Sequence, residues 1–234
     1  MRENSSNKAG VVFLFDVDNT LLDNDRVISD LRSHLDHEVG AVRASRYWDA
    51  FEQLRDQMGY ADYLGALQRF RSEYPHEIKL LTVSRFLVNY PFANRLFPGS
   101  LDAIEHVAAF GTAVILSDGD VVFQPRKVER SGLSEAVEKR VLIYIHKEEE
   151  LDDVERRHPA EHYVLVDDKV RILTAVKGRW GKRVTTVFPR QGHYAHAADV
   201  ASYPQPDITI ERIADLVGYD LPALLGASQA REAR

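Results

Sequence analysis

Phe15-Asp16-Val17-Asp18-Asn19-Thr20-Leu21-Leu22 is the stretch that decides the fold, because it continues directly from the apolar run of residues 11–15. Five consecutive apolar residues are typical of a strand buried on both faces of a parallel sheet. Aspartate is a poor strand former and is seldom fully buried without a partner. Open α/β sheets bind their ligands at the carboxyl ends of the strands. The placement of Asp16 and Asp18 at a strand end therefore indicates a functional site.

Three later apolar runs support this interpretation over the alternative, which is a solvated strand end with a local turn. Each of them also ends in polar residues: 113–116 before Ser117-Asp118-Gly119, 141–145 before His146-Lys147, and 163–166 before Asp167-Asp168-Lys169. The chain thus presents, in order, an Asp-x-Asp, a Ser, a Lys and an acidic pair.

This ordered set resembles the four motifs of the haloacid dehalogenase superfamily, which are Asp-x-Asp-x-Thr, a Ser or Thr, a Lys, and an acidic pair. The resemblance covers roughly residues 11–24 and 93–190. It implies that the first and fourth strands are neighbours, so that their carboxylates converge. The catalytic residues that it implies are Asp16, Asp18, Ser117 and Lys147, and the metal ligands are Asp16, Asp18, Asp167 and Asp168.

Converging carboxylates would need a cation. Two unit charges about 4 Å apart interact by roughly 4 kcal/mol at an effective dielectric constant of 20. Mg²⁺ suits a site made of oxygen ligands, whereas no histidine cluster accompanies the acids to favour zinc. We expect Asp16, Asp168 and the backbone carbonyl of Asp18 to be ligands, with Asp167 either a direct ligand or next to one.

The resemblance implies a role for each catalytic side chain. Asp16 would attack the phosphoryl group and form an aspartyl-phosphate, and Asp18 would protonate the leaving oxygen and later deprotonate the hydrolytic water. Ser117 would hold the phosphoryl group and Lys147 would neutralise its charge. A serine after a strand is also commonly a helix cap, and a lysine before three glutamates is commonly a surface ion pair. Lys127 is the alternative to Lys147.

We expect the substrate to be a small phosphorylated metabolite. The loop after the fifth predicted strand, residues 184–188, would face the same side as Asp16, and Arg190 suits bidentate contact with an anion. This loop is also compatible with an ordinary surface connection. The residues that we expect to contact the substrate are Thr20, Ser117, Asp118, Gly119, Arg190 and His193.

The second carboxylate separates the reaction classes of the superfamily. Its true dehalogenases lack an acid at the position of Asp18, because halide leaves without protonation, so Asp18 favours the hydrolysis of phosphate monoesters. A phosphomutase and a non-catalytic phosphate-binding relative are the alternatives. One departure is Ile172, where members of the family often carry a further aspartate.

Other classes of phosphate and metal site fit less well. A calcium EF-hand loop would need glycine where Leu21 stands and glutamate where Val27 stands. No G-x-x-x-x-G-K-[ST] string occurs, which argues against a P-loop. A signalling receiver domain has its acidic pair after the first strand and lacks a helical insertion.

The region between the first and second strands predicts four helices. Apolar residues recur every third or fourth position within it, and the breaks fall at Gly40, Gly59 and Pro75. The resemblance implies that such an insertion is a cap over the active site. We therefore predict an α/β core formed by residues 1–24 and 93–234 and an inserted α-helical cap of residues 25–92.

After Pro91 the sequence alternates between helix and strand. Helices are predicted at 101–110, 148–158, 171–180 and 211–217, and a broken helical region at 121–136. They alternate with strands, the last two of which are predicted at 184–188 and 208–210. Such alternation predicts a Rossmann-like parallel sheet with helices on both faces.

Composition sets the remaining limits. The 234 residues include no cysteine, which excludes thiol catalysis and disulfides. A formal charge of −6 argues mildly against nucleic acid as a partner. No apolar run is long enough for a membrane span, and residues 1–10 lack the apolar core of a signal peptide. We therefore expect a cytoplasmic protein that binds neither nucleic acid nor membranes; the sequence leaves its oligomeric state open.

Overall fold

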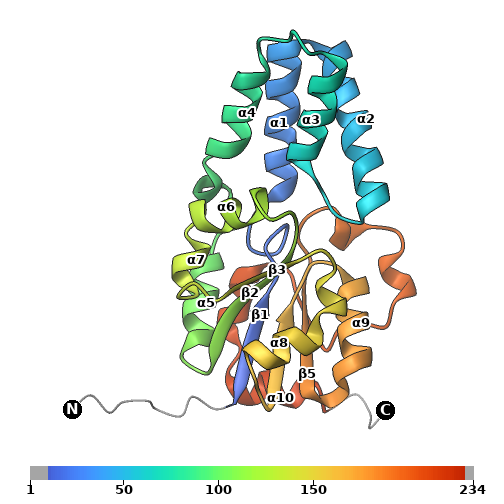
Figure 1. Cartoon of the computed structure of the whole chain (residues 1–234). Coiled ribbons are helices and arrows are strands. Elements are labelled where there is room, and N and C mark those ends of the chain that lie inside the picture. Colours follow the sequence, from blue (N-terminus) through green and yellow to red (C-terminus); the bar gives the residue numbers. More distant parts are fainter. Residues whose placement is uncertain (1–9, 230–234) are drawn as a thin grey trace, which may run out of the picture.

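Strand β1 lies inside a six-stranded parallel sheet in the computed structural model, which describes residues 10–229 (Figure 1). The strand order is β3-β2-β1-β4-β5-β6, and every neighbouring pair is parallel. The strands are β1 (Val11–Phe15), β2 (Thr112–Asp118), β3 (Val141–Tyr144), β4 (His162–Val166), β5 (Val184–Pro189) and β6 (Ile208–Ile210). The predicted Rossmann-like parallel sheet is confirmed.

The strand register brings the first and fourth strand ends together. Phe15 is level with Ile115 of β2 on one side and with Val166 of β4 on the other. The backbone N–H of Asp16 still donates to the carbonyl of Val166, at 3.0 Å. Asp16 and the acidic pair after Val166 therefore leave the sheet side by side.

Side chains of β1 alternate between two apolar cores, one on each face of the sheet. Phe13 and Phe15 pack in the first core, and Val12 and Leu14 in the second. Helices α5, α6, α7 and α10 contribute to the first core, and helices α8 and α9 to the second. Both faces are thus covered, as all-parallel sheets require.

Ten α-helices occur among residues 10–229. They are α1 (Asn24–Val39), α2 (Ala41–Met58), α3 (Tyr63–Glu73), α4 (Leu80–Asn89), α5 (Ser100–Ala108), α6 (Phe123–Arg130), α7 (Leu133–Ala136), α8 (Leu151–Arg157), α9 (Val170–Trp180) and α10 (Leu221–Ala227).

Helices α1–α4 stand beyond the carboxyl ends of the strands (Figure 1). All four run between β1 and β2, as the sequence predicts, and the breaks after α1 and α2 fall at Gly40 and Gly59. Both glycines have positive φ, +80° and +79°, which disfavours other residues. The division into core and cap stays a prediction.

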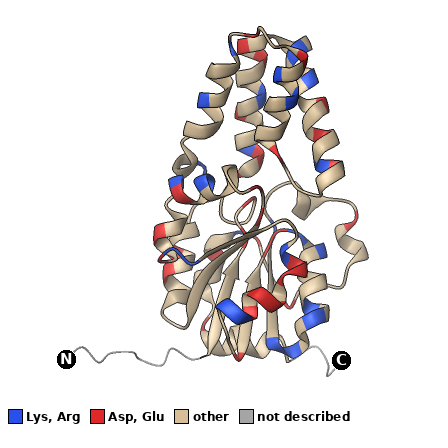
Figure 2. Cartoon of the chain, viewed as in Figure 1, with Lys and Arg blue, Asp and Glu red and all other residues tan. Residues whose placement is uncertain are grey.

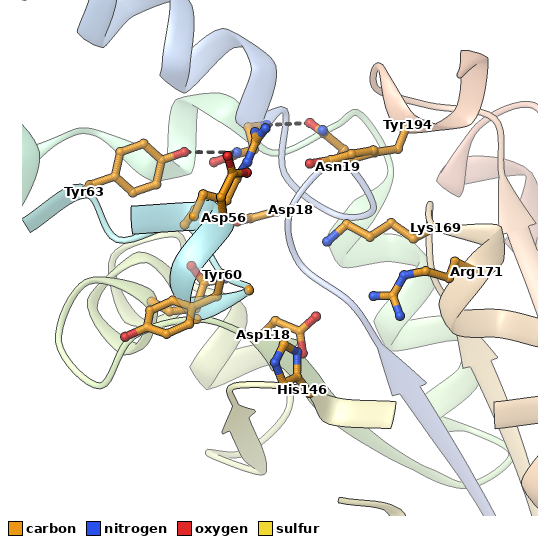
Figure 3. Close-up of a pocket in the computed structure, with 16 residues that line it drawn as sticks. Asp18, Asn19, Asp56, Tyr60, Tyr63, Asp118, His146, Lys169, Arg171 and Tyr194 are labelled. Atoms are coloured by element: carbon orange, nitrogen blue, oxygen red, sulfur yellow. Dashed lines mark hydrogen bonds between the residues drawn. The ribbon is translucent and has the colours of Figure 1, made fainter. Parts of the chain in front are cut away.

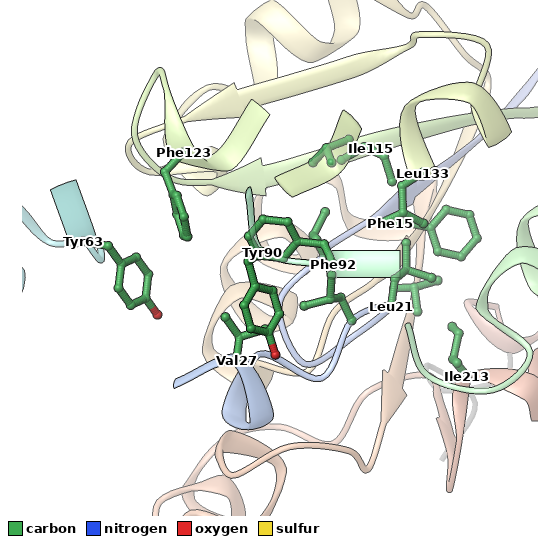
Figure 4. Packing of buried hydrophobic residues seen from close by; sticks show 14 of the residues in the cluster. Phe15, Leu21, Val27, Tyr63, Tyr90, Phe92, Ile115, Phe123, Leu133 and Ile213 are labelled. Atoms are coloured by element: carbon green, nitrogen blue, oxygen red, sulfur yellow. The ribbon is translucent and has the colours of Figure 1, made fainter. Parts of the chain in front are cut away.

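Aromatic side chains join this helical insertion to the rest of the chain. The ring of Tyr63 in α3 lies 5.1 Å from that of Phe123 in α6, and Phe123 lies 5.7 Å from Phe92 (Figure 4). The first apolar core is therefore continuous from the sheet into helices α1–α4. Its members include Val27 and Tyr63 at one end and Phe15 and Ile213 at the other.

Two features near the end of the chain differ from the prediction. The helix predicted at 211–217 is a 3₁₀ helix, Ile213–Gly218. Helix α10 was not predicted; it begins with an N-cap at Asp220, whose side chain accepts from the N–H of Ala223, and has a proline in its first turn.

Charged residues of both signs are interspersed along the helices (Figure 2). Of the helices in the described part of the chain, none combines the length and apolar character needed to cross a membrane. Most of the segment considered above as a signal peptide, residues 1–9, lies outside the described residues.

Candidate active site

Three buried aspartates meet where β1 and β4 end. One carboxylate oxygen from each of Asp16, Asp167 and Asp168 lies within 4.8 Å of the others. Their side chains are almost wholly excluded from solvent. Asp16 Oδ2 and both oxygens of Asp168 have no hydrogen-bond partner. Buried carboxylate oxygens without partners are costly, so the cluster has the character of a cation site.

Lys147 is the cation that the structure places in this cluster. Its Nζ contacts Asp16 Oδ1 and lies 2.7 Å from Asp167 Oδ2, and its side chain is fully buried. Burial alone would lower the pKa of Lys147, but Asp16 and Asp167 raise it well above its ordinary value. The lysine is therefore held as an ammonium beside Asp16.

The acidic pair is nevertheless left short of positive charge. Burial, followed by repulsion from Asp16 and Asp167, raises the pKa of Asp168 well above its ordinary value. Burial also raises the pKa of Asp167, against the opposing effect of Lys147. Both shifts mean that a further cation would stabilise the ionised cluster.

Lys127, the alternative motif lysine, lies at a different carboxylate. Its Nζ is 2.7 Å from Asp18 Oδ1 and 2.8 Å from Oδ2. The two lysines are thus divided between the two carboxylates of the Asp-x-Asp segment, Lys147 at Asp16 and Lys127 at Asp18.

Ser117 is the last residue but one of β2, and its side chain is buried. Its hydroxyl accepts from Nε2 of Gln124, at 3.0 Å. A side chain at Gly119 would collide with Gln124, since a Cβ there would lie 2.6 Å from Gln124 Cβ. Asp118 accepts from the backbone N–H of Lys147, at 2.8 Å, and so ties the β2 loop to the β3 loop.

Thr20, like Asp16, Ser117 and Lys147, is almost wholly buried and does not line the cavity described below. Its hydroxyl accepts from the backbone N–H of Asp168 at 3.0 Å. The contact that the structure shows joins the two acidic loops.

A cavity of about 340 Å³ opens between this edge of the sheet and the helical insertion (Figure 3). It is lined by Asp18, Asn19, Asn24, Arg55, Asp56, Gly59, Tyr60, Ala61, Tyr63, Asp118, Gly119, Gln124, His146, Lys169, Arg171 and Tyr194. Both the α2–α3 segment and the strand ends contribute, so a molecule in the cavity would touch both parts of the fold.

Two cations that the sequence reasoning missed point into this cavity from the start of α9. Lys169 and Arg171 both extend toward Asp18 and Asp118 in Figure 3. Arg171 pairs with Glu148 at 2.5 Å. Burial alone would lower the pKa of Lys169, but Asp16 and Asp168 raise it. Cations at a helix N-terminus oppose the helix dipole. Two of them at the predicted start of this helix were therefore a signal in the sequence that these side chains have a function.

The loop after β5 reaches the cavity through a different residue than predicted. Tyr194 lines the cavity, and the centre of its ring lies 5.1 Å from Nζ of Lys169. His193 instead bonds Asp25, with its backbone N–H 2.8 Å from Oδ2. Arg190 pairs with Glu211 at 3.2 Å. Neither of the two predicted substrate contacts lines the cavity.

Comparison with solved structures gives a match at high identity. A protein described as a haloacid dehalogenase-like hydrolase from Burkholderia xenovorans is 61% identical, with a TM-score of 0.87 over 91% of this chain and 99% of that one. No family model matches the sequence. No match is found among the curated proteins.

Two more distant structures share the fold. The HAD hydrolase YfnB from Bacillus subtilis, bound to magnesium, is 15% identical with a TM-score of 0.58, over 90% of this chain and 98% of that one. The L-2-haloacid dehalogenase from Xanthobacter autotrophicus is 19% identical with a TM-score of 0.56, over 90% and 97%. At these identities the likeness concerns the fold alone.

Proposed function

The chain belongs to the haloacid dehalogenase-like hydrolases, and we propose that within this family it hydrolyses small phosphate monoesters with the help of Mg²⁺. The observation that carries the proposal is the buried cluster of Asp16, Asp167 and Asp168, three of whose oxygens have no partner. Such an arrangement is costly unless a further cation balances it, which supports a metal-dependent hydrolase.

The residues present fit magnesium. The donors are all oxygens, which hard divalent cations prefer, and Asp16 Oδ2 and both oxygens of Asp168 are without a hydrogen-bond partner. We assign the ion to Asp16, Asp168 and the backbone carbonyl of Asp18, with Asp167 beside it. One of the neighbours of the same fold is described as bound to magnesium. When bound, the ion would reduce the repulsion between the Asp16 carboxylate and an anionic substrate.

Asp16 is the nucleophile in this proposal. An oxygen of its carboxylate attacks the phosphorus, the bond from phosphorus to the ester oxygen breaks, and an aspartyl-phosphate forms. Lys147, held against Asp16, and the Ser117 hydroxyl oppose the charge on the phosphoryl oxygens. Water then attacks the phosphorus, the bond to Asp16 breaks, and inorganic phosphate leaves.

Asp18 serves both half-reactions as the proton carrier. It gives a proton to the leaving ester oxygen in the first step and takes one from the attacking water in the second. Its side chain lines the cavity and is 25% exposed, so a substrate can reach it. Dehalogenation needs no such acid, since halide leaves as an anion. The position of Asp18 therefore supports phosphate esters over haloacids.

Three cationic side chains on the cavity wall could bind an anionic substrate, beside the carboxylates of Asp18, Asp56 and Asp118. Arg55 enters from α2, while Lys169 and Arg171 enter from the start of α9. Cationic side chains bind phosphate by charge-assisted hydrogen bonds. A volume of about 340 Å³ matches a small metabolite rather than a polymer.

Helices α1–α4 are proposed to form the cap, residues 25–92 inserted into a core of residues 1–24 and 93–234. Arg55, Tyr60 and Tyr63 from this insertion face Asp118 and Lys169 of the core across the cavity. Substrate selection would depend on these residues, because the reacting groups all come from the core.

The test is a panel of phosphorylated metabolites assayed with Mg²⁺, using wild type, Asp16→Asn and Asp18→Asn. We expect Asp16→Asn to abolish turnover and Asp18→Asn to slow it by about 10²–10⁴-fold, the contribution of general acid–base catalysis. Turnover of 2-haloacids but of no phosphate ester would contradict the proposal. Near wild-type activity of folded Asp16→Asn would reject Asp16 as the nucleophile.

A further inference from the structure

Lys127 is a buried cation to which the proposed mechanism gives no role. It lies in the middle of α6 with its side chain fully excluded from solvent. Its ammonium donates to both oxygens of Asp18, at 2.7 and 2.8 Å, and to Oδ1 of Asn24, at 3.0 Å. An ammonium has three donors, so these contacts account for all of them.

Stability alone does not explain this arrangement. Burying a lysine costs several kcal/mol of hydration, and well-packed apolar residues often serve a fold as well as a buried ion pair or better. The surroundings would accept an apolar residue, since the ring of Phe123 lies 5.5 Å from Lys127 Nζ. The pair is also asymmetric: Lys127 is hidden, whereas Asp18 faces the cavity. Lys127 therefore supports Asp18 from behind.

The double contact fixes the direction of the carboxylate. Because both oxygens of Asp18 bond the same nitrogen, rotation of the carboxylate would lengthen one of the two bonds. A general acid must lie within hydrogen-bond reach of the oxygen that it protonates, and a displacement of about 1 Å can cost about 10²-fold in rate. The orientation of Asp18 is thus a property on which the rate depends.

Asn24 extends this contact to the helical insertion. It is the first residue of α1, its Oδ1 accepts from Lys127, and its Nδ2 lies 3.5 Å from the hydroxyl of Tyr63 in α3. Tyr63 in turn packs on Phe123, one helical turn before Lys127 (Figure 4). Lys127 therefore lies where α1, α3 and α6 meet behind Asp18.

We propose that Lys127 is the positioning residue of Asp18, which it holds in the orientation needed for proton transfer to the leaving group. This inference rests on the proposed function, because it concerns the acid of that reaction. Lys127 itself does not touch the substrate.

The experiment compares kcat and KM of wild type, Lys127→Met, Asp18→Asn and the double variant on aryl phosphates of graded leaving-group acidity. We expect Lys127→Met to lower kcat about 10²-fold for poor leaving groups, far less for good ones, with little change in KM. The double variant should be no slower than Asp18→Asn, because residues that act as a unit are not additive. Lys127→Arg, which can also donate two bonds to a carboxylate, should recover part of the loss.

Lys177→Met is the matched control. Lys177 pairs with Asp207 at 2.8 Å, outside the cavity. Its loss should lower the stability of the protein without changing the dependence on the leaving group. Equal losses by Lys127→Met across all leaving groups, or losses that add to those of Asp18→Asn, would overturn the inference.

A structural measurement separates this inference from the proposed function. Crystals of ligand-free Lys127→Met, or of Lys127→Gln should the Met variant not fold, should show the Asp18 carboxylate turned from its wild-type direction. An unchanged Asp18 would overturn the inference even if wild type hydrolysed phosphate esters. If wild type hydrolysed none, the proposed function would fail, whereas a turned Asp18 would still support the positioning contact.

Discussion

At the scale of single residues, the site is built from unequal carboxylates. Asp16 and Asp167 share the ammonium of Lys147, Asp18 has Lys127 to itself, and Asp168 has no cation within ion-pair distance among the described residues. Lys169, the next residue in the sequence, lies near enough to Asp168 for the Asp168 carboxylate to raise the pKa of Lys169. In this division of charge Asp168 has the greatest need of the proposed metal, and Lys169 is left as a cation on the cavity wall.

Lys169 is therefore expected to bind the phosphoryl group or its product. Charge-assisted hydrogen bonds contribute about 1.5–3 kcal/mol, so Lys169→Met should weaken competitive inhibition by inorganic phosphate about 10–100-fold. The control is Lys79→Met. In wild type the ammonium of Lys79 pairs with Glu38 on the surface of the helical insertion. Equal inhibition of wild type and Lys169→Met by phosphate would mean that Lys169 serves only to neutralise the aspartates.

The sequence indicated the charged residues that gather at the strand ends better than the residues that line the cavity. The sequence could indicate these residues because each of them comes shortly after the end of an apolar strand: Asp16, Asp18, Asp167, Asp168 and Lys147. Arg55 and Tyr60 could not be predicted, because their position depends on how α2 and α3 pack over the strand ends. The same holds for Tyr194, which lies one residue from the predicted His193 but on the side of the loop that faces the cavity.

At the scale of elements, the segment between α2 and α3 touches the strand ends at Gly59. A Cβ built on Gly59 would lie 2.3 Å from Cε1 of His146, which follows β3. The segment between α2 and α3 therefore packs closely on the His146 ring, and Gly59 and His146 both line the cavity.

Gly59→Ala should consequently alter catalysis, whereas Gly40→Ala should not. Both glycines have positive φ, so each change should cost about 1–3 kcal/mol of stability through backbone strain. Only at Gly59 is there an additional clash, since nothing lies within 4 Å of a Cβ at Gly40. We expect kcat/KM to fall by up to about 10²-fold in Gly59→Ala alone, with partial recovery when His146→Ala is added. Matching kinetics of the two glycine variants would show that this contact does not position the insertion.

The prediction of the elements was most accurate where a period or a terminator was clear. Helices α1–α4 and strand β6 followed from apolar spacing and from Gly40 and Gly59. The region after β6 was less clear, because its six-residue 3₁₀ helix has no room for a helical period and α10 is only seven residues long. The sequence does carry a start signal for α10, namely Asp220 at the N-cap and a proline in the first turn.

At the scale of the whole molecule, cation binding and stability should be linked. An ion that binds only the folded protein stabilises it by about 2.7 kcal/mol at 100 times its dissociation constant. For a chain of this size the melting temperature should then rise by roughly 5–10 °C between chelator and saturating Mg²⁺.

The size of this rise should depend on Asp168. Asp168→Asn should lose most of it and should melt at or above the wild-type temperature in chelator, because a repelling buried charge has been removed. The control is Asp152→Asn, because Asp152 is exposed and pairs with Arg179 on the surface. This variant should keep the full rise in melting temperature with Mg²⁺. A melting temperature unaffected by millimolar Mg²⁺ would contradict the proposal that the aspartate cluster binds this ion.

The central claim is that the phosphoryl group passes through Asp16. Rapid acid quenching during turnover of para-nitrophenyl phosphate with Mg²⁺, followed by mass spectrometry of the peptides, tests it directly. We expect a phosphoryl group on Asp16 in wild type, more of it in Asp18→Asn, where the attacking water lacks its base, and none in Asp16→Asn. Turnover without a phosphoryl group on Asp16, or with one on another residue, would contradict the account.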